Sequence, residues 1–157
     1  MKIKLIVVGK TKSKFLVEGE KVYSERLKHY CKFTEFIIPN VKNSSKLSTL
    51  VLKNNEGKSL LSAINNSAEV ILLDANGSSF SSFEFSTFLN KKLLSTNKEL
   101  VFVVGGAFGF SGEVYNRADL KLSLSKMTFS HQMIRLIFKE QLYRAFTILK
   151  GEKYHHE

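Results

Sequence analysis

The sequence predicts an α/β fold in which helices flank a parallel β-sheet. Segments with the three- and four-residue apolar spacing of helices alternate with short apolar runs along the whole chain. The short runs are largely apolar and do not alternate with polar residues, as expected for strands of a parallel sheet that is covered on both faces. A chain of 157 residues has the length of one domain with a substantial core, so we expect a single domain over residues 1–157.

The first predicted strand is the apolar run over residues 3–8, which ends at Gly9. Three lysines follow in the next loop, at positions 10, 12 and 14. Ligands of open parallel sheets bind beyond the carboxyl ends of the strands, so this basic loop is a candidate part of a site at that edge. Apolar residues at helical spacing then predict a helix over residues 15–30.

A strand, a helix and a further strand are predicted next. The strand covers residues 34–38, and a proline ends it. The helix covers residues 48–65, although two asparagines and a glycine near its centre predict a kink or a break. The third strand covers residues 70–73, and the Asn-Gly pair at 76–77 predicts a turn after it.

A serine at position 81 or 82 can cap the third helix, whose apolar positions continue to Leu94. A fully apolar fourth strand over residues 100–104 then leads directly into a glycine-rich loop. A short helix is predicted after this loop, from Ser111 to about residue 118.

The glycines of that loop stand at positions 105, 106 and 109. They do not follow the G-x-G-x-x-G order of dinucleotide-binding loops, and no P-loop Gly-Lys-Ser/Thr follows them, which argues against a nucleotide-binding oxidoreductase. A sharp turn explains Gly109. For the adjacent pair, a turn and the close approach of a ligand to the bare backbone both remain open.

A fifth strand is predicted over residues 120–124, and a long helix follows it. This helix is the clearest periodic segment of the sequence. Ser130 is a natural N-cap for a helix that begins at His131. The apolar surface of this helix extends around more than half of its circumference, which predicts one contact with the sheet and another with a second subunit. Four charged residues interrupt the surface, either to bind phosphate or carboxylate groups or to face solvent: Arg135, Lys139, Glu140 and Arg144.

The composition favours a nucleic-acid partner. The formal net charge is +10, and such a surplus attracts polyanions. No apolar run approaches the length that crosses a bilayer, and the N-terminus lacks the features of a signal peptide, so we expect no membrane contact and a cytoplasmic protein. The single cysteine, Cys31, excludes an internal disulfide and a cysteine-cluster metal site, and we expect it to be a small buried residue. We expect no metal.

Three loops are predicted to meet at the carboxyl edge of the sheet. They follow the third, fourth and fifth strands, and they begin at Leu73, at Gly105 and at Ser125. The third of them, over residues 125–130, is rich in hydroxyl groups. This edge is therefore the candidate ligand site.

From the fourth strand to its end, the chain resembles the ribosomal RNA large subunit methyltransferase H family, a group of small SPOUT-class methyltransferases. The motifs that carry the resemblance are GG-x-x-G, R-A-D followed by L-S-L-S-K-M-T, H-Q-M-x-R, E-Q-L-Y-R-A-F and a terminal Y-H. They occur in the order and at the spacing of the family. The N-terminal half agrees more loosely, through K-I-K-L-I-V-V-G-K and the L-L-D of the third strand.

The resemblance implies a C-terminal trefoil knot, a homodimer packed at the knot, and S-adenosylmethionine as the methyl donor bound there. The implied reaction is methylation of N3 of a pseudouridine in 23S ribosomal RNA, on the assembled ribosome. By matching position, the donor contacts are expected to be Leu73, Gly106, Ser125, Lys126, Met127, Thr128, Phe129 and Ser130.

The resemblance also implies that Arg144, Tyr154 and His155 face the RNA or the reacting base. An imide N–H is a poor nucleophile until its proton leaves, so our hypothesis is that His155 assists deprotonation and that Arg144 steadies the developing anion. We expect the tail to order only with its partners. Two alternatives remain: a non-catalytic RNA- or ribosome-binding module of the same fold, and a SPOUT methyltransferase that acts on transfer RNA.

Overall fold

The computed structural model of the protein describes residues 1–95 and 97–156. Its strands form one parallel sheet in the order β2-β1-β4-β3-β5. In chain order the elements are β1 (Lys2–Val8), α1 (Lys14–Leu27), β2 (Lys32–Ile38), a 3₁₀ turn (Ser44–Lys46), α2 (Thr49–Ser62), β3 (Glu69–Ser79), α3 (Ser82–Ser95), β4 (Leu100–Val103), α4 (Gly112–Arg117), β5 (Leu120–Ser123) and α5 (Met133–Lys150).

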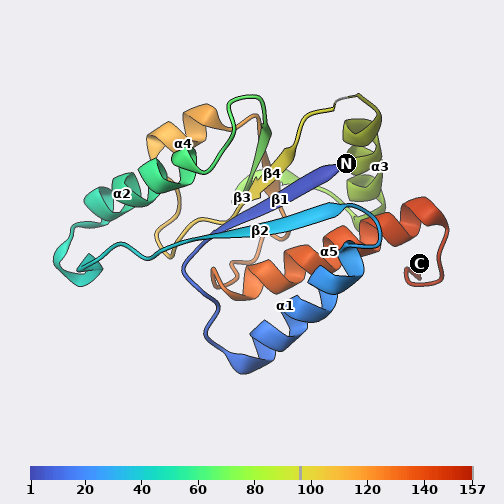
Figure 1. The fold of residues 1–157 in the computed structure, drawn as a ribbon, viewed down its shortest axis with the longest axis horizontal. Coiled ribbons are helices and arrows are strands. Elements are labelled where there is room, and N and C mark those ends of the chain that lie inside the picture. Colours follow the sequence, from blue (N-terminus) through green and yellow to red (C-terminus); the bar gives the residue numbers. More distant parts are fainter. Residues whose placement is uncertain (96, 157) are drawn as a thin grey trace.

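The molecule has three layers (Figure 1), with α2 and α4 on one face of the sheet and α1, α3 and α5 on the other. Two buried apolar clusters fill the spaces between the layers. One contains Leu27 of α1, Leu89 of α3 and Phe138 of α5, and the other contains Leu60 of α2 and Val114 of α4. The predicted α/β fold, with helices on both faces of a parallel sheet, is confirmed.

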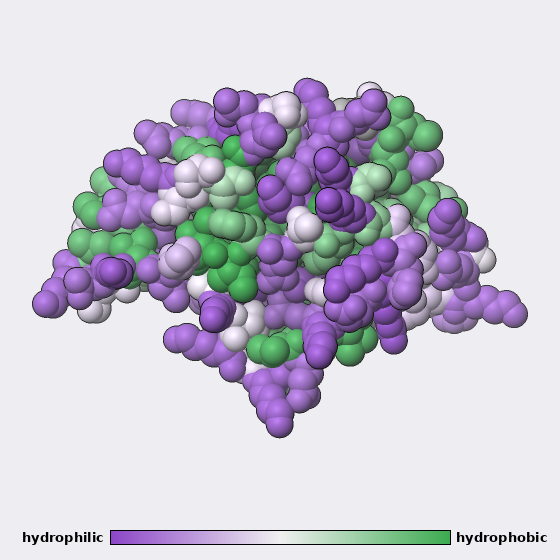
Figure 2. Space-filling view, viewed as in Figure 1, coloured by the Kyte–Doolittle hydropathy of each residue, from purple (hydrophilic) through white to green (hydrophobic). Residues whose placement is uncertain are grey.

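The outer surface is mostly hydrophilic in the view of Figure 2, with hydrophobic side chains in separate patches over α1, α2 and α3. Among the described residues, no helix has both the length and the apolar character needed to cross a membrane.

Two predictions about local structure are wrong. The third strand does not end at Leu73 with a turn after it, because β3 continues to Ser79 and pairs again with β5 after a shift in register between Leu73 and Ser78. The helix α2 has no break at its centre. Its Gly57 packs so closely on α4 that a Cβ atom there would lie 2.3 Å from Ser111 Oγ, so the glycine serves close helix packing.

The start of α5 differs slightly from the prediction. The regular helix begins at Met133, after a turn at residues 131–132. The expected capping by Ser130 is nevertheless present, since its Oγ accepts a hydrogen bond from Met133 N–H at 3.1 Å and its carbonyl accepts one from Ile134 N–H at 3.1 Å. Ser130 therefore ends the loop and starts the helical hydrogen bonding.

Two of the charged side chains on α5 are buried. Lys139 is 2% exposed and forms ion pairs with Glu20 of α1, at 3.1 Å, and with Glu35 of β2. Arg135 is fully buried and donates to backbone carbonyls. Lys139 thus binds carboxylates, as one of the two alternatives predicted, but they belong to its own chain. For Arg135 the prediction is wrong, because this side chain neither faces solvent nor binds a phosphate or a carboxylate.

Candidate functional site

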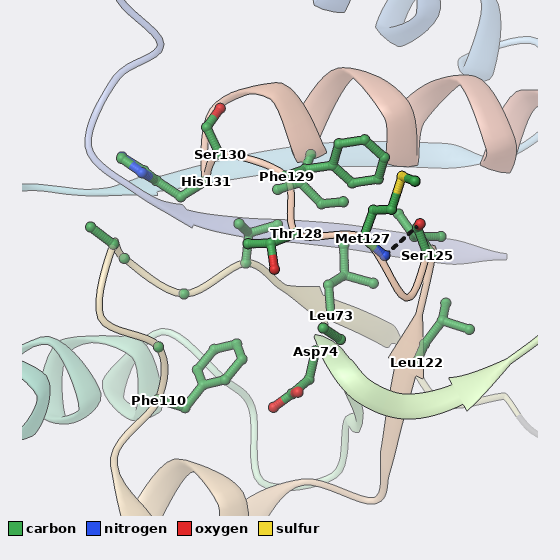
Figure 3. A pocket seen from close by; sticks show the side chains of 18 of the residues that line it. Leu73, Asp74, Phe110, Leu122, Ser125, Met127, Thr128, Phe129, Ser130 and His131 are labelled. Atoms are coloured by element: carbon green, nitrogen blue, oxygen red, sulfur yellow. Dashed lines mark hydrogen bonds between the residues drawn. The ribbon is translucent and has the colours of Figure 1, made fainter.

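A cavity of about 520 Å³ opens at the carboxyl edge of the sheet, between the ends of β3, β4 and β5 and the start of α5 (Figure 3). Its volume is within the usual range for small-molecule sites. The three loops predicted to meet at this edge all line it. Seven of the eight predicted donor contacts are lining residues: Leu73, Gly106, Ser125, Met127, Thr128, Phe129 and Ser130. The eighth, Lys126, is exposed and does not line the cavity.

The loop over residues 125–130 arches across one side of the cavity (Figure 3). Ser125 Oγ accepts a hydrogen bond from Met127 N–H at 2.9 Å, and the buried Ser123 hydroxyl donates to the Ser125 carbonyl at 2.9 Å. These bonds fix the turn locally, which is a common role of serine. The Met127 side chain is 77% exposed at the rim of the cavity, so its apolar surface is available to contact a bound ligand.

The glycine loop forms a second wall. Gly109 has φ of +85° and its N–H donates to the Gly106 carbonyl at 3.1 Å, which confirms the predicted sharp turn. Gly106 is required for a different reason, because a Cβ atom there would lie 2.6 Å from Glu56 Oε2. Gly106 thus separates a buried carboxylate of α2 from the cavity.

Asp74 is the carboxylate on the cavity wall, and it is held in place from two sides. Tyr115 OH donates to its Oδ2 at 2.6 Å, and Asn76 N–H donates to its Oδ1 at 2.8 Å. Burial and the hydrogen bond to Asp74 raise the pKa of Tyr115 to about 12, so this phenol stays protonated as a donor. Tyr115 was missed from the sequence, where a lone tyrosine in a short helix gives no signal.

His131 lines the cavity at the start of α5. Burial lowers the pKa of its imidazole, and the positive charges of Arg135 and Lys12 lower it further. The dipole of α5 also disfavours a cation at this end of the helix. Cys31 is likewise buried as expected, and burial raises the pKa of its thiol to about 11, which makes it a poor nucleophile at neutral pH.

The wall of the cavity offers two kinds of surface to a small ligand. Apolar side chains supply one kind of surface, and backbone groups and hydroxyls supply the other. The apolar side chains include Leu73, Phe110, Leu122, Leu124 and Ile134. Among the described residues, no group of three or more His, Cys, Asp or Glu side chains is arranged to hold a metal ion.

Arg144, Tyr154 and His155 form a separate cluster at the other end of α5. Arg144 NH1 lies 3.3 Å from His155 Nδ1, and its guanidinium carbon lies 4.7 Å from the centre of the Tyr154 ring. None of the three lines the cavity. Ten residues separate Arg144 from Ile134 at the cavity, or about 15 Å along the helix axis. Within one chain, the residues expected to contact the donor and the residues expected to face the RNA therefore lie apart.

Tyr154 has partners within its own chain, so the expectation that the tail orders only with another molecule is wrong. Its ring packs against Tyr143 at 4.7 Å between centroids, and its hydroxyl donates to Glu140 Oε1 at 3.0 Å. Burial and hydrogen bonds with Tyr23 and Glu140 raise the pKa of Tyr154. The hydrogen bond with Glu140 raises the pKa of Arg144, which therefore stays a cation.

Comparisons with known proteins show the family to which the chain belongs. The sequence profile described as "Predicted SPOUT methyltransferase" matches residues 1–155. A protein of Christiangramia forsetii named ribosomal RNA large subunit methyltransferase H is 56% identical over 156 residues, which cover 99% of each chain. A protein of the same name from Parabacteroides distasonis is 54% identical over 157 residues and the full length of both chains.

A solved structure shares the fold at lower sequence similarity. It is a probable methylase family protein from Haemophilus influenzae, 14% identical, with a TM-score of 0.55 over 99% of this chain and 70% of that one. Nearly the whole chain therefore matches one profile, close relatives of one name and one fold. The protein belongs to the SPOUT methyltransferase family and, within it, to the ribosomal RNA large subunit methyltransferase H family.

Proposed function

We propose that the protein transfers a methyl group from S-adenosylmethionine to N3 of a pseudouridine in 23S ribosomal RNA, on the assembled ribosome in the cytoplasm. The observation that carries the proposal is the cavity at the carboxyl edge, whose walls include seven residues expected to contact the donor. The close relatives are named as ribosomal RNA large subunit methyltransferases, and the formal charge of +10 suits a polyanionic substrate.

The cavity fits the proposed donor in both size and chemistry. Leu73, Leu122 and Ile134 offer apolar surface for an adenine ring, while the glycine loop and the hydroxyls of Ser125 and Thr128 offer polar groups. When bound, the donor supplies a methyl group on a positively charged sulfur. The residues of the chain then have to align this methyl group with the acceptor nitrogen and keep water out.

The Arg144 cluster can supply a proton acceptor and a positive charge for the reaction at the acceptor nitrogen. The N3 proton of the base has to leave before the nitrogen attacks, and the resulting anion needs a positive neighbour. Arginine can only donate, so His155 Nδ1 is the acceptor in its contact with Arg144 and has a lone pair there. His155 can take the proton at this nitrogen when Arg144 turns toward the anion. Tyr154 packs on the guanidinium and orients it.

A homodimer unites the cavity and the cluster, which lie apart within one chain. Four half-buried apolar side chains of α5 belong to neither core cluster: Met133, Leu136, Ile137 and Ile148. Leu136 lies against Gly19 of α1, and the other three are available for a subunit contact. We propose that two subunits pack through α5 beside the trefoil knot expected for the family. The cluster of one subunit would then reach the cavity of the other.

Mass spectrometry of ribosomal RNA tests the function. Cells that lack the gene should lose one methyl group from a pseudouridine of 23S ribosomal RNA and keep all transfer RNA methylation. The purified protein with labelled S-adenosylmethionine should restore the group on ribosomes from these cells, and less well on deproteinised RNA. Unchanged 23S ribosomal RNA in the deletion strain would refute the proposal, and loss of a transfer RNA methyl group would redirect it.

A further inference from the structure

The basic segment Lys10–Lys14 lies beside the cavity because α5 holds it there. The segment leaves the carboxyl end of β1 and passes the start of α5 before α1 begins (Figure 1), and the trace from β1 runs close to His131 in the close-up (Figure 3). Gln132 contacts it at two points. Lys12 N–H donates to Gln132 Oε1 at 3.0 Å, and Gln132 Nε2 donates to the Lys10 carbonyl at 3.4 Å.

Arg135 holds the base of the same segment. Its guanidinium donates to the Val8 and Gly9 carbonyls, each at 2.7 Å, and to Thr11 Oγ1 at 3.2 Å. The same side chain donates through Nε to the His131 carbonyl at 3.0 Å. The side chain is fully buried, so these acceptors replace water around its charge. Arg135 thereby connects the backbone of the basic segment to a residue of the cavity wall.

The lysines themselves face outward. Lys10, Lys12 and Lys14 are exposed. Among residues 1–95 and 97–156, no carboxylate forms an ion pair with Lys10 or Lys12, and Lys14 has only a 4.0 Å contact with the exposed Glu18. Burial lowers the pKa of His131 on the cavity wall, and the charges of Arg135 and Lys12 lower it further, in keeping with a basic segment near this residue. Three exposed cations thus stand on a backbone that is held against the start of α5, next to the cavity-lining residue His131.

We propose that the Lys10–Lys14 segment binds the phosphate backbone of the RNA substrate, and that Gln132 is a positioning residue that holds the segment against the cavity. The proposal rests on the proposed function in taking RNA as the substrate. Lysine ammonium groups bind phosphates as point charges, without selecting a base sequence. The segment therefore gives affinity and register, while the cavity and the Arg144 cluster act on the target base.

The lysine contacts predict a change in the salt dependence of binding. The variant Lys10→Gln/Lys12→Gln should bind purified ribosomes at low salt roughly tenfold more weakly, and the slope of log affinity against log salt should fall by about 1.5 for two lost phosphate contacts. The matched control is Lys46→Gln/Lys58→Gln, which removes the same charge from exposed lysines on the α2 side of the molecule. S-adenosylmethionine affinity, measured by calorimetry, should stay the same in both variants.

Gln132→Ala separates positioning from charge. It removes no charge, so it should weaken ribosome binding several-fold while leaving the salt slope as in the wild type. Equal effects of the lysine variant and its control, or an equal loss of donor affinity in the lysine variant, would overturn the phosphate assignment. Unchanged ribosome binding by Gln132→Ala would overturn the positioning role. A wild-type protein that neither binds nor methylates ribosomes would instead refute the proposed function.

Discussion

Gly106 lines the cavity and also packs closely against a buried side chain of α2. A Cβ atom there would lie 2.6 Å and 2.7 Å from the two carboxylate oxygens of Glu56, which is only 9% exposed and has little room to move. Gly106→Ala should therefore push the glycine loop into the cavity. We expect S-adenosylmethionine to bind about tenfold more weakly, a loss of the size typical for overpacking at a tight contact. Isothermal calorimetry measures this loss directly.

The control removes the group that causes the clash. In Gly106→Ala/Glu56→Ala the space of the carboxylate is free for the new methyl group, so donor affinity should recover most of the way to the wild-type value. Donor affinity in the double variant that stays as low as in Gly106→Ala would show that Gly106 acts through its own contact with the ligand. Ligand approach would then be the reason for the glycine pair.

Glu56 also predicts a pH dependence of stability. Among the described residues, no hydrogen bond or ion pair joins its carboxylate, and burial raises its pKa above the ordinary value of 4.5. A raised pKa in the folded state means that folding favours the protonated form. The carboxyl group therefore costs no stability below pH 4.5, and its penalty grows as pH rises through the folded-state pKa.

Glu56→Gln should consequently raise the free energy of unfolding at pH 7 by about 1 kcal/mol, and the gain should vanish below the ordinary pKa. Urea unfolding between pH 4 and pH 8 measures the difference from the wild type. Glu18→Gln, at an exposed position of α1, should show almost no such trend. A Glu56→Gln variant that is less stable at pH 7 would mean that the carboxylate has a favourable partner.

The three loops that line the cavity were predictable from the sequence because each is contiguous and follows a strand, whereas the individual donor contacts were expected only from the family resemblance. Hydroxyl side chains and glycines mark such loops locally, and the parallel fold brings the strand ends together. Tyr115 lines the cavity but was not recognised as part of the site, and neither were the buried positions of Glu56 and Arg135 behind it. These placements depend on tertiary contacts, which leave no local pattern. An arginine on a helix in particular is usually solvated, whereas Arg135 is fully buried.

At the scale of elements, α2 and α4 depend on the absence of a side chain at position 57. A Cβ atom there would lie 2.3 Å from Ser111 Oγ and 3.3 Å from Val114 Cγ2, and Ser111 caps α4. Gly57→Ala should therefore lower the free energy of unfolding by about 1–3 kcal/mol, although alanine favours helices. Chemical denaturation gives the value.

Gly112→Ala is the matched control, because nothing lies within 4 Å of a Cβ atom at that position in the first turn of α4. It should be neutral or slightly stabilising, by up to about 1 kcal/mol. Similar stability changes in the two variants would show that helix propensity, and not close packing, determines the effect at Gly57.

The elements that the sequence could predict are those that depend on local patterns, and the contact at Gly57 is an example of what it could not predict. Alternating apolar runs and helical spacings gave every strand and α-helix in the correct order, since each pattern is local. The break expected in α2 failed because a glycine that is costly in an isolated helix is favoured where α4 packs against it. The end of β3 failed because its last residues pair with β5 across a register shift, and pairing with a distant strand is not visible in a local Asn-Gly signal.

For the whole molecule, the arrangement of charge follows the proposed path of the RNA. The basic segment lies at the cavity end of α5, and the Arg144 cluster lies at the other end. Lys139, between them on the helix, forms ion pairs within the chain. Two of the places at which positive charge can meet the RNA therefore lie at opposite ends of α5, and at one of them Arg144 is also paired with Glu140. In a dimer with α5 at the interface, the basic segment of one subunit and the cluster of its partner would flank one target base.

A composite site across two subunits predicts complementation. His155→Ala should keep its donor affinity but lose most of its turnover, and Gly106→Leu should lose donor binding through a stronger clash with Glu56. A heterodimer of these two variants, isolated through two different tags, contains one intact pairing of cavity and cluster. By the symmetry of a two-fold dimer it should regain about half of the wild-type activity. A site contained within one chain would leave both subunits inactive, so a heterodimer no more active than its parents would refute the composite site.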